Sequence, residues 1–230
     1  MTTRTITIER DVQAGPRRAA SELRRNFSAE GTLVVNMLSS PGSGKTSLLE
    51  ATARHWNGRF RMAVLVGDLA TDRDAQRLAP FVPVVQLTTG GACHLELPLI
   101  ERGLEVWGEQ RFDFLFIENV GNLVCPSSHD LGEHVRVILL SVTEGDDKPG
   151  KYPKAFRTSQ ALVISKTDLL PYVPFSVAAA VLDAKRIQPE LRALPVCALN
   201  GSGIGDWCAF LEAEREKLKV NSHAENRTAP

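Results

Sequence analysis

The sequence predicts an α/β protein with a mostly parallel sheet flanked by helices on both faces. The first observation is a mostly apolar run at residues 33–38, which leads into the stretch SSPGSGKT at 39–46 and then into a helical pattern. Short apolar runs of this kind are typical of strands buried on both faces. The second observation is that similar runs alternate with helical patterns along the chain, at residues 62–66, 82–87, 112–117, 136–142, 161–164 and 195–199. Alternating strands and helices indicate parallel strands joined by helical crossovers.

Length and composition indicate a single domain. The chain has 230 residues, enough to bury a sizeable core. Basic and acidic side chains number 27 each, so the net charge gives no reason to expect binding to nucleic acid or to an acidic membrane surface. No apolar stretch is long enough to cross a membrane and the first residues lack the apolar core of a signal peptide, so we expect a cytoplasmic protein. Its four cysteines are then candidates for metal ligands or nucleophiles rather than for disulfides.

Residues 39–46 predict a phosphate-binding loop, because glycines between a strand and a helix let backbone N–H groups converge on an anion. Lys45 adds a positive charge for the phosphates, and the Thr46 hydroxyl can ligate Mg²⁺. The usual pattern begins with glycine, whereas this chain has Ser39. The alternative, an ordinary Gly/Ser-rich turn, is disfavoured by the flanking strand and helix. The groups expected to bind the nucleotide at this loop are Gly42, Ser43, Gly44, Lys45, Thr46 and Ser47.

Acidic residues follow two of the predicted strands, at the edge where ligands bind to open parallel sheets. Asp68 comes after the run at 62–66 and Glu118 directly after the run at 112–117. We expect Asp68 and Glu118 to hold Mg²⁺ together with Thr46, and to act with Lys45 as the catalytic residues. Asp72 and Asp74 compete with Asp68 for these roles, although Asp72 is also placed to cap a helix.

Residues 165–168, SKTD, follow another predicted strand and favour guanine as the base. Asp168 can accept hydrogen bonds from the guanine N1–H and exocyclic amine, a pair of donors that adenine lacks. Lys166 can stack its aliphatic stem on the base. The usual motif begins with Asn, and Ser165 in that place removes an amide hydrogen bond worth about 1 kcal/mol.

Cys93, His94 and Cys125 lie in two loops that follow predicted strands, and both loops belong to the same edge of the sheet. Two thiols and an imidazole suit Zn²⁺ or Ni²⁺, with an open position or a ligand from a second subunit completing the shell. Ordinary structural cysteines are the alternative, and the three residues alone do not exclude it. His129 and His134 could assist this site, although we expect each of them on a helix surface. We place Cys197 and Cys208 in the core.

The motifs occur in the order SSPGSGKT, GDLATDRDAQRL, GACHL, FIENVGNLVCP, LLSVTEGDDKPGKYPKAFR and SKTDLLPY. This order resembles the HypB family of hydrogenase nickel-incorporation GTPases, which belong to the SIMIBI class, over residues 15–219. The resemblance implies a GTPase that uses GTP and Mg²⁺, binds Ni²⁺ or Zn²⁺ through Cys93, His94 and Cys125, and forms a homodimer with GTP. It also implies nickel delivery to the hydrogenase large subunit, with a nickel metallochaperone as a second partner.

The resemblance also sets the expected domain organisation and the alternatives. We divide the chain into an N-terminal segment with an amphipathic helix (1–30), a P-loop GTPase domain (31–219) and a disordered tail (220–230). Residues 1–30 contain neither Cys nor His, so the nickel-binding or storage segment of many family members is not expected. The alternatives are a nucleotide-regulated metal-storage protein without significant turnover, a urease-type nickel GTPase, whose Cys-Pro-His motif is absent, and a P-loop kinase, which residues 165–168 disfavour.

Overall fold

A seven-stranded sheet forms the centre of the computed structural model, which describes residues 14–228, with side chains for residues 15–220. The strands are β1 (Leu33–Ser39), β2 (Met62–Asp68), β3 (Val84–Thr88), β4 (Phe114–Glu118), β5 (Val135–Ser141), β6 (Ala161–Ser165) and β7 (Arg192–Pro195). Their order across the sheet is β3-β2-β4-β1-β5-β6-β7, and every neighbouring pair is parallel. The predicted α/β class with a mostly parallel sheet is therefore confirmed.

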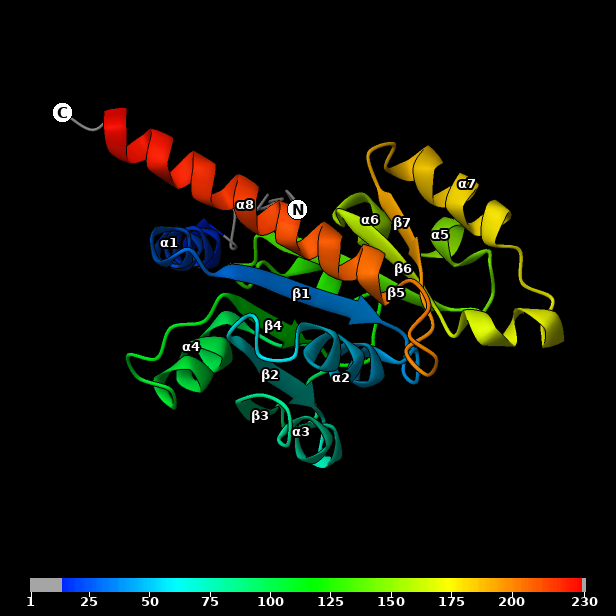
Figure 1. The fold of residues 1–230 in the computed structure, drawn as a ribbon, viewed down its shortest axis with the longest axis horizontal. Helices are drawn as coiled ribbons and strands as arrows, with labels where there is room; N and C mark the ends of the chain where they lie inside the picture. Colours follow the sequence, from blue (N-terminus) through cyan, green and yellow to red (C-terminus); the bar gives the residue numbers. More distant parts are fainter. Residues whose placement is uncertain (1–13, 229–230) are drawn as a thin grey trace, which may run out of the picture.

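Helices cover both faces of this sheet (Figure 1). The helices are α1 (Ala14–Glu30), α2 (Lys45–Trp56), α3 (Arg73–Leu78), α4 (Leu97–Glu105), α5 (Lys148–Lys151), α6 (Pro153–Arg157), α7 (Val177–Ile187) and α8 (Ile204–Thr228), with 3₁₀ turns at Pro126–Ser128 and Thr167–Tyr172. Side chains of α2, α3 and α8 pack with one face of the strands, and those of α1, α4, α6 and α7 pack with the other. None of the helices in the described part of the chain has both the length and the apolar composition needed to cross a bilayer.

The parallel register brings the carboxyl ends of the central strands to one edge. Met37 of β1 lies beside Glu118 of β4, and Val66 of β2 lies on the other side of Glu118. β1 is buried along its whole length, as its apolar sequence predicts. The residues that follow β1, β2, β4 and β6 therefore share the edge at which the candidate site is built.

Two predicted boundaries near the end of the chain are wrong. The last strand is Arg192–Pro195 rather than 195–199, because residues 196–203 form a turn in which Cys197 N–H donates to Ser202 O at 2.8 Å. The predicted disordered tail is helical as far as Thr228, since no Gly or Pro follows Gly205 before Pro230 to interrupt α8. Residues 1–13 of the predicted N-terminal segment, like residues 229–230, lie outside the described residues.

Candidate nucleotide and metal site

The loop between β1 and α2 has the conformation that its glycines allow. Gly42 and Gly44 have φ angles of 73° and 93°, in the left-handed region that residues with a Cβ seldom adopt. Ser39 ends β1 below this loop and is fully buried, with its Oγ accepting from Lys45 Nζ at 2.8 Å. Burial lowers the pKa of the Lys45 amine. Serine in the place of the usual first glycine therefore gives the lysine a partner, and the predicted loop geometry is present.

Thr46 and Glu118 meet at the edge of the sheet. The Thr46 hydroxyl donates to Glu118 Oε1 at 2.8 Å, and Glu118 is only 3% exposed. Its other carboxylate oxygen, Oε2, is buried without a hydrogen-bond partner, and burial raises the pKa of this carboxyl to about 7. A buried hydroxyl and an oxygen with free acceptor capacity are oxygen donors of the kind that Mg²⁺ binds, so this pair fits the predicted metal.

The other acidic candidates have partners in their own turns. Asp68 ends β2 and accepts from the N–H groups of Ala70 and Thr71 at 2.9 and 3.1 Å, hydrogen bonds that lower the pKa of its carboxyl against the effect of desolvation. Asp72 accepts from the side chain of Gln76, and its side chain makes no capping bond to α3. Asp74 pairs with Arg77 in the same helix. Asp68 thus lies at the predicted strand end, but its carboxylate is engaged by the turn that follows.

A cavity of about 810 Å³ opens beside the phosphate loop, between the start of α2, the end of β6 and the turn after β7. Among the residues lining it are Gly44, Ser47, Lys166, Asp168 and Leu199. Lys166 Nζ donates to Gly42 O at 2.7 Å, and Asp168 Oδ1 accepts from the Cys197 thiol at 3.0 Å. The structure therefore brings the predicted base-binding residues next to the predicted phosphate-binding residues.

Ser165 connects these two parts of the site. Its hydroxyl donates to Ser43 O at 2.6 Å, which ties the end of β6 to the phosphate loop. The sequence predicts only the loss of an asparagine amide at this position, and the hydroxyl provides a link that this prediction missed. Cys197 and Cys208 are both buried, as expected, with Cys197 also orienting Asp168.

Cys93, His94 and Cys125 come together from the loops after β3 and β4. One candidate ligand atom from each residue lies within 4.8 Å of the other two. His94 Nδ1 lies 3.8 Å from Cys93 Sγ, whereas its buried Nε2 lies 3.4 Å from a carboxylate oxygen of Glu96. The neighbouring Cys125 thiol, ahead of desolvation, raises the pKa of the Cys93 thiol. Two thiols and an imidazole nitrogen at this spacing fit Ni²⁺ or Zn²⁺.

Both histidines placed on helix surfaces by the sequence are found elsewhere. The His129 ring stacks on the His94 ring with a centroid distance of 4.0 Å, and its Nδ1 lies 3.0 Å from Cys125 O. His134 lies in the loop before β5, where its Nδ1 accepts from Val34 N–H at 3.0 Å and burial lowers its pKa to about 4. His129 is thus a neighbour of the metal cluster. The sequence signal for this contact is the spacing. His129 follows Cys125 by four residues, and one 3₁₀ turn lies between them.

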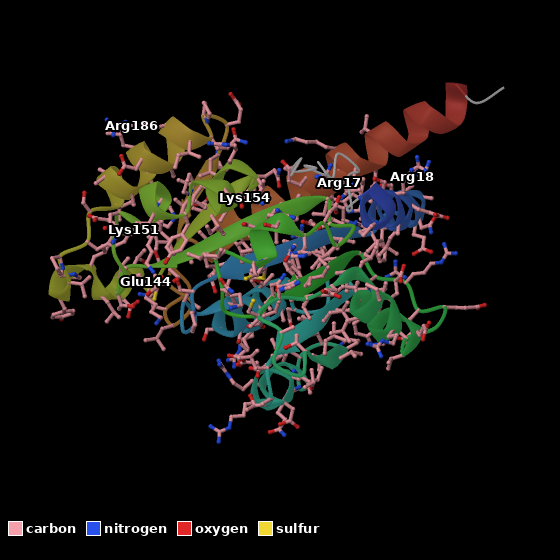
Figure 2. All side chains as sticks on the ribbon, turned by 180° about the vertical axis from the view of Figure 1, so that it is seen from behind. Arg17, Arg18, Glu144, Lys151, Lys154 and Arg186 are labelled. Carbon is pink, nitrogen blue, oxygen red and sulfur yellow. The ribbon has the colours of Figure 1, made fainter. Side chains whose placement is uncertain are left out.

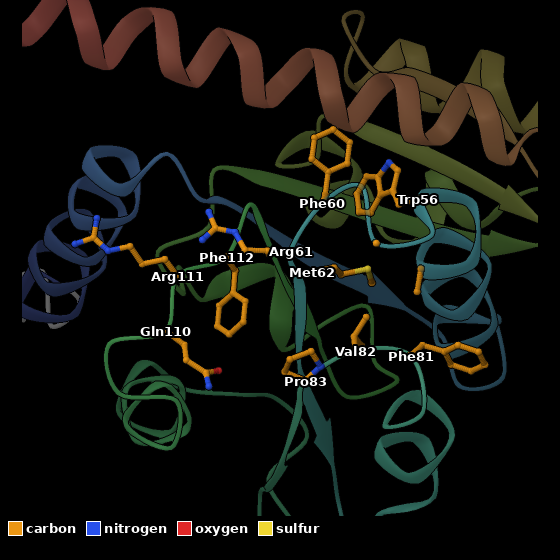
Figure 3. Close-up of a pocket in the computed structure, with 12 residues that line it drawn as sticks. Trp56, Phe60, Arg61, Met62, Phe81, Val82, Pro83, Gln110, Arg111 and Phe112 are labelled. Carbon is orange, nitrogen blue, oxygen red and sulfur yellow. The ribbon is translucent and has the colours of Figure 1, made fainter.

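A second hollow of about 450 Å³ lies away from these residues, where β2 begins and the loops before β3 and β4 converge (Figure 3). Trp56, Phe60 and Phe112 give it aromatic walls, and Arg61 and Arg111 supply its charged groups. Its lining contains no carboxylate, thiol or imidazole. The candidate metal ligands therefore lie at the opposite edge, with the phosphate loop.

Residues 33–195 match the family described as "CobW/HypB/UreG, nucleotide-binding domain". The chain is also 45% identical over 213 residues to the hydrogenase maturation factor HypB of Azotobacter vinelandii, covering 92% of this chain and 70% of the relative. The chain belongs to the HypB family. HypB of Escherichia coli K12 is 42% identical, with 92% and 73% of the two chains covered. The resemblance inferred from the order of the motifs is thus confirmed.

Solved HypB structures have the same fold as this member of the family. HypB from Helicobacter pylori in complex with nickel is 40% identical, with a TM-score of 0.84 over 89% of this chain and 96% of that one. HypB from Archaeoglobus fulgidus is 35% identical, with a TM-score of 0.81 over 88% and 99% of the two chains. Because the chain belongs to this family of P-loop proteins, it is a nucleotide hydrolase.

Proposed function

We propose that this HypB-family protein is a metal-binding GTPase that couples GTP binding and slow hydrolysis to GDP and phosphate with nickel delivery during [NiFe]-hydrogenase maturation. The observation that carries the proposal is that one short segment, residues 118–125, holds Glu118 beside the phosphate loop and Cys125 in the metal cluster. The relatives' names support it, since they are hydrogenase maturation factors. The nickel complex of the Helicobacter pylori relative supports Ni²⁺ as the cargo.

In this proposal the phosphate loop and its neighbours bind GTP and Mg²⁺. Backbone N–H groups of residues 42–47 and the Lys45 ammonium hold the phosphates, while Thr46, Glu118 and Asp68 hold Mg²⁺ directly or through water. Bound Mg²⁺ supplies positive charge against the charge that develops on the phosphates during transfer. Asp68 and Glu118 are the candidates for orienting the attacking water. Release of Lys45 from Ser39 would accompany phosphate binding.

Guanine selection is assigned to the 810 Å³ cavity. Asp168, oriented by the Cys197 thiol, would accept from the two guanine donors, and the Lys166 stem would cover the face of the base. A strong preference for ATP would instead favour a kinase. The measured ratio of GTP to ATP affinity therefore distinguishes the two classes of P-loop protein.

The metal is proposed to be cargo that Cys93, His94 and Cys125 hold, with Ni²⁺ or Zn²⁺ matching the donor set. GTP would favour a homodimer in which the metal loops lie near the interface. The recipient would be the hydrogenase large subunit and the donor a nickel metallochaperone, all in the cytoplasm. A ligand shifts such an equilibrium only if it binds the two states with different affinity, so metal affinity must depend on the nucleotide.

A metal titration with and without a non-hydrolysable GTP analogue, monitored for oligomeric state, tests the proposal. We expect one metal site per chain, a metal affinity that changes with the analogue, and dimers in the analogue-bound state. The same preparation should convert GTP to GDP and phosphate. Metal binding that is indifferent to the nucleotide, with no turnover, would instead support a metal-storage protein.

A further inference from the structure

We infer that Asn122 is the positioning residue through which the phosphate loop controls the geometry of the metal cluster. The inference rests on the proposed function, and it assigns the regulation of that site to one side chain. Asn122 lies four residues after Glu118 and three before Cys125, and it belongs to neither the predicted nucleotide set nor the predicted metal ligands. Its contacts extend to both sites.

On the nucleotide side, the turn that contains Asn122 is in direct backbone contact with the phosphate loop. The Asn122 backbone forms an isolated antiparallel bridge with Ser39. One residue earlier, a Cβ added to Gly121 would lie 2.8 Å from the Cα of Pro41, so the two backbones leave no room for a side chain between them. A displacement of the loop at Ser39 to Pro41 is therefore passed to the turn at Gly121 and Asn122.

On the metal side, the Asn122 side chain holds both ligand loops. Its Nδ2 donates to Cys93 O at 3.4 Å, and its Oδ1 accepts from Val124 N–H at 2.8 Å. The first bond reaches the loop of Cys93 and His94, and the second fixes the residue before Cys125. A change in the Asn122 position consequently changes the relation between the two halves of the cluster.

The phosphate loop can have two arrangements because the Lys45 ammonium can bind either Ser39 or the phosphates. In this structure its ammonium donates to the buried Ser39 hydroxyl at 2.8 Å. Bound phosphates compete for the same ammonium, so the Ser39 hydroxyl loses the Lys45 ammonium as its donor when nucleotide binds. Ser39 is bridged to Asn122, so the exchange occurs next to the residue that spans the metal loops. Glycine at position 39 would have no hydroxyl to take part in it.

The test is calorimetry of Ni²⁺ binding, once with Mg²⁺-GDP and once with a Mg²⁺-bound, non-hydrolysable GTP analogue. For each protein, the ratio is the larger of the two Ni²⁺ dissociation constants divided by the smaller. In the wild type we expect the two constants to differ by about fivefold or more. Asn122→Ala should bring the ratio close to one. Asn122→Asp keeps the acceptor for Val124 N–H but cannot donate to Cys93 O, so it should also lower the ratio. Because the ratio compares two states of one variant, a general loss of affinity does not move it.

Thr89→Val is the matched control. The Thr89 hydroxyl donates to Ala92 O at 2.7 Å within the Cys93 loop, so this substitution removes one hydrogen bond from a metal loop without touching the turn at Asn122. It should weaken Ni²⁺ binding equally with both nucleotides and leave the ratio unchanged. Linkage adds a reciprocal measurement, since in the wild type Ni²⁺ must change the ratio of the GDP and GTP-analogue affinities by the same factor, and this effect should be lost in Asn122→Ala.

The outcomes separate the inference from the proposed function. A wild-type ratio above one that both Asn122 variants retain overturns the role of Asn122 and leaves the proposed function standing. A wild-type ratio of one overturns the coupling itself, and the role of Asn122 with it. A lowered ratio in Thr89→Val as well would mean that any loosening of the metal loops abolishes the effect, which also contradicts a specific role for Asn122.

Discussion

Glu118 carries a buried carboxyl group whose protonation should be visible in the stability of the nucleotide-free protein. Burial raises its pKa from 4.5 to about 7, so the folded protein holds this proton more tightly than the unfolded chain. The stabilising contribution is present below pH 4.5 and is lost as the pH rises through 7. A pKa change of this size corresponds to roughly 3 kcal/mol at most.

We therefore predict that the free energy of unfolding of Glu118→Gln increases relative to the wild type between pH 4.5 and pH 8. Gln has nearly the same shape as Glu and carries no charge at any of these pH values. Urea denaturation of both proteins across this range, without nucleotide, measures the difference. A difference that stays constant with pH would contradict the raised pKa of Glu118 in the folded protein.

Lys45 is the residue whose loss should separate the two activities. Lys45→Ala removes the charge proposed to hold the phosphates, and we expect GTP turnover to fall by about 100-fold or more. Lys45→Ala should still bind one Ni²⁺ per chain in the absence of nucleotide, because Lys45 is not one of the proposed metal ligands Cys93, His94 and Cys125. Phosphate-release kinetics and Ni²⁺ calorimetry check the two parts. Lys151→Ala, on the surface seen in Figure 2, is the control and should retain turnover.

His129 should contribute to metal affinity through its contact with His94. His129→Ala loses both the ring stacking and the contact with Cys125 O, and we expect Ni²⁺ affinity to fall by about tenfold. His129→Phe keeps a ring that can stack, so its loss should be smaller. In calorimetry of the three proteins, the Ni²⁺ affinity should fall in the order wild type, His129→Phe, His129→Ala. Equal affinities would show that the stacked ring does not support the ligand.

At the scale of elements, α8 is fixed to α2 by a buried hydrogen bond. Trp207 Nε1 donates to the Thr52 hydroxyl at 2.9 Å, and both residues are fully buried. Trp207→Phe removes this bond and leaves a small cavity, so we predict a loss of about 1–2 kcal/mol in the free energy of unfolding. Trp107→Phe, at a half-buried position on the other face, should lose less. Urea denaturation of the wild type and the two variants measures both losses in the free energy of unfolding.

The elements that the sequence predicted well are those whose signal is local. The strand, glycine loop and helix around Lys45 are contiguous, so their pattern alone determines them. The positions of Cys93, His94 and Cys125 follow from parallel topology, which places both loops at one edge. The features that were missed depend on contacts across the fold. The stacking of His129 on His94 joins two loops whose separation the sequence does not give, and the position of His134 depends on β1.

At the scale of the whole molecule, one edge of the sheet carries the phosphate loop, the base cavity and the metal cluster, while the aromatic hollow lies at the other. Two exposed apolar side chains flank this functional edge. Leu69 follows Asp68 and is 46% exposed, and Val124 precedes Cys125 and is 59% exposed. Exposed apolar groups of this kind, beside the segments proposed to respond to nucleotide, are suited to a contact with a second subunit.

We predict that Val124 lies in the contact of the proposed GTP-dependent dimer. Val124→Asp places a charge beside the metal loop, so the variant should remain monomeric with the GTP analogue and Ni²⁺ at concentrations where the wild type dimerises. Val106→Asp is the control, because Val106 is 68% exposed but lies beyond the end of α4, on the way to the amino end of β4. Sedimentation velocity measures both variants. Dimerisation of Val124→Asp to the wild-type extent would place the interface away from the metal loop, and the metal would then have to be held within one subunit.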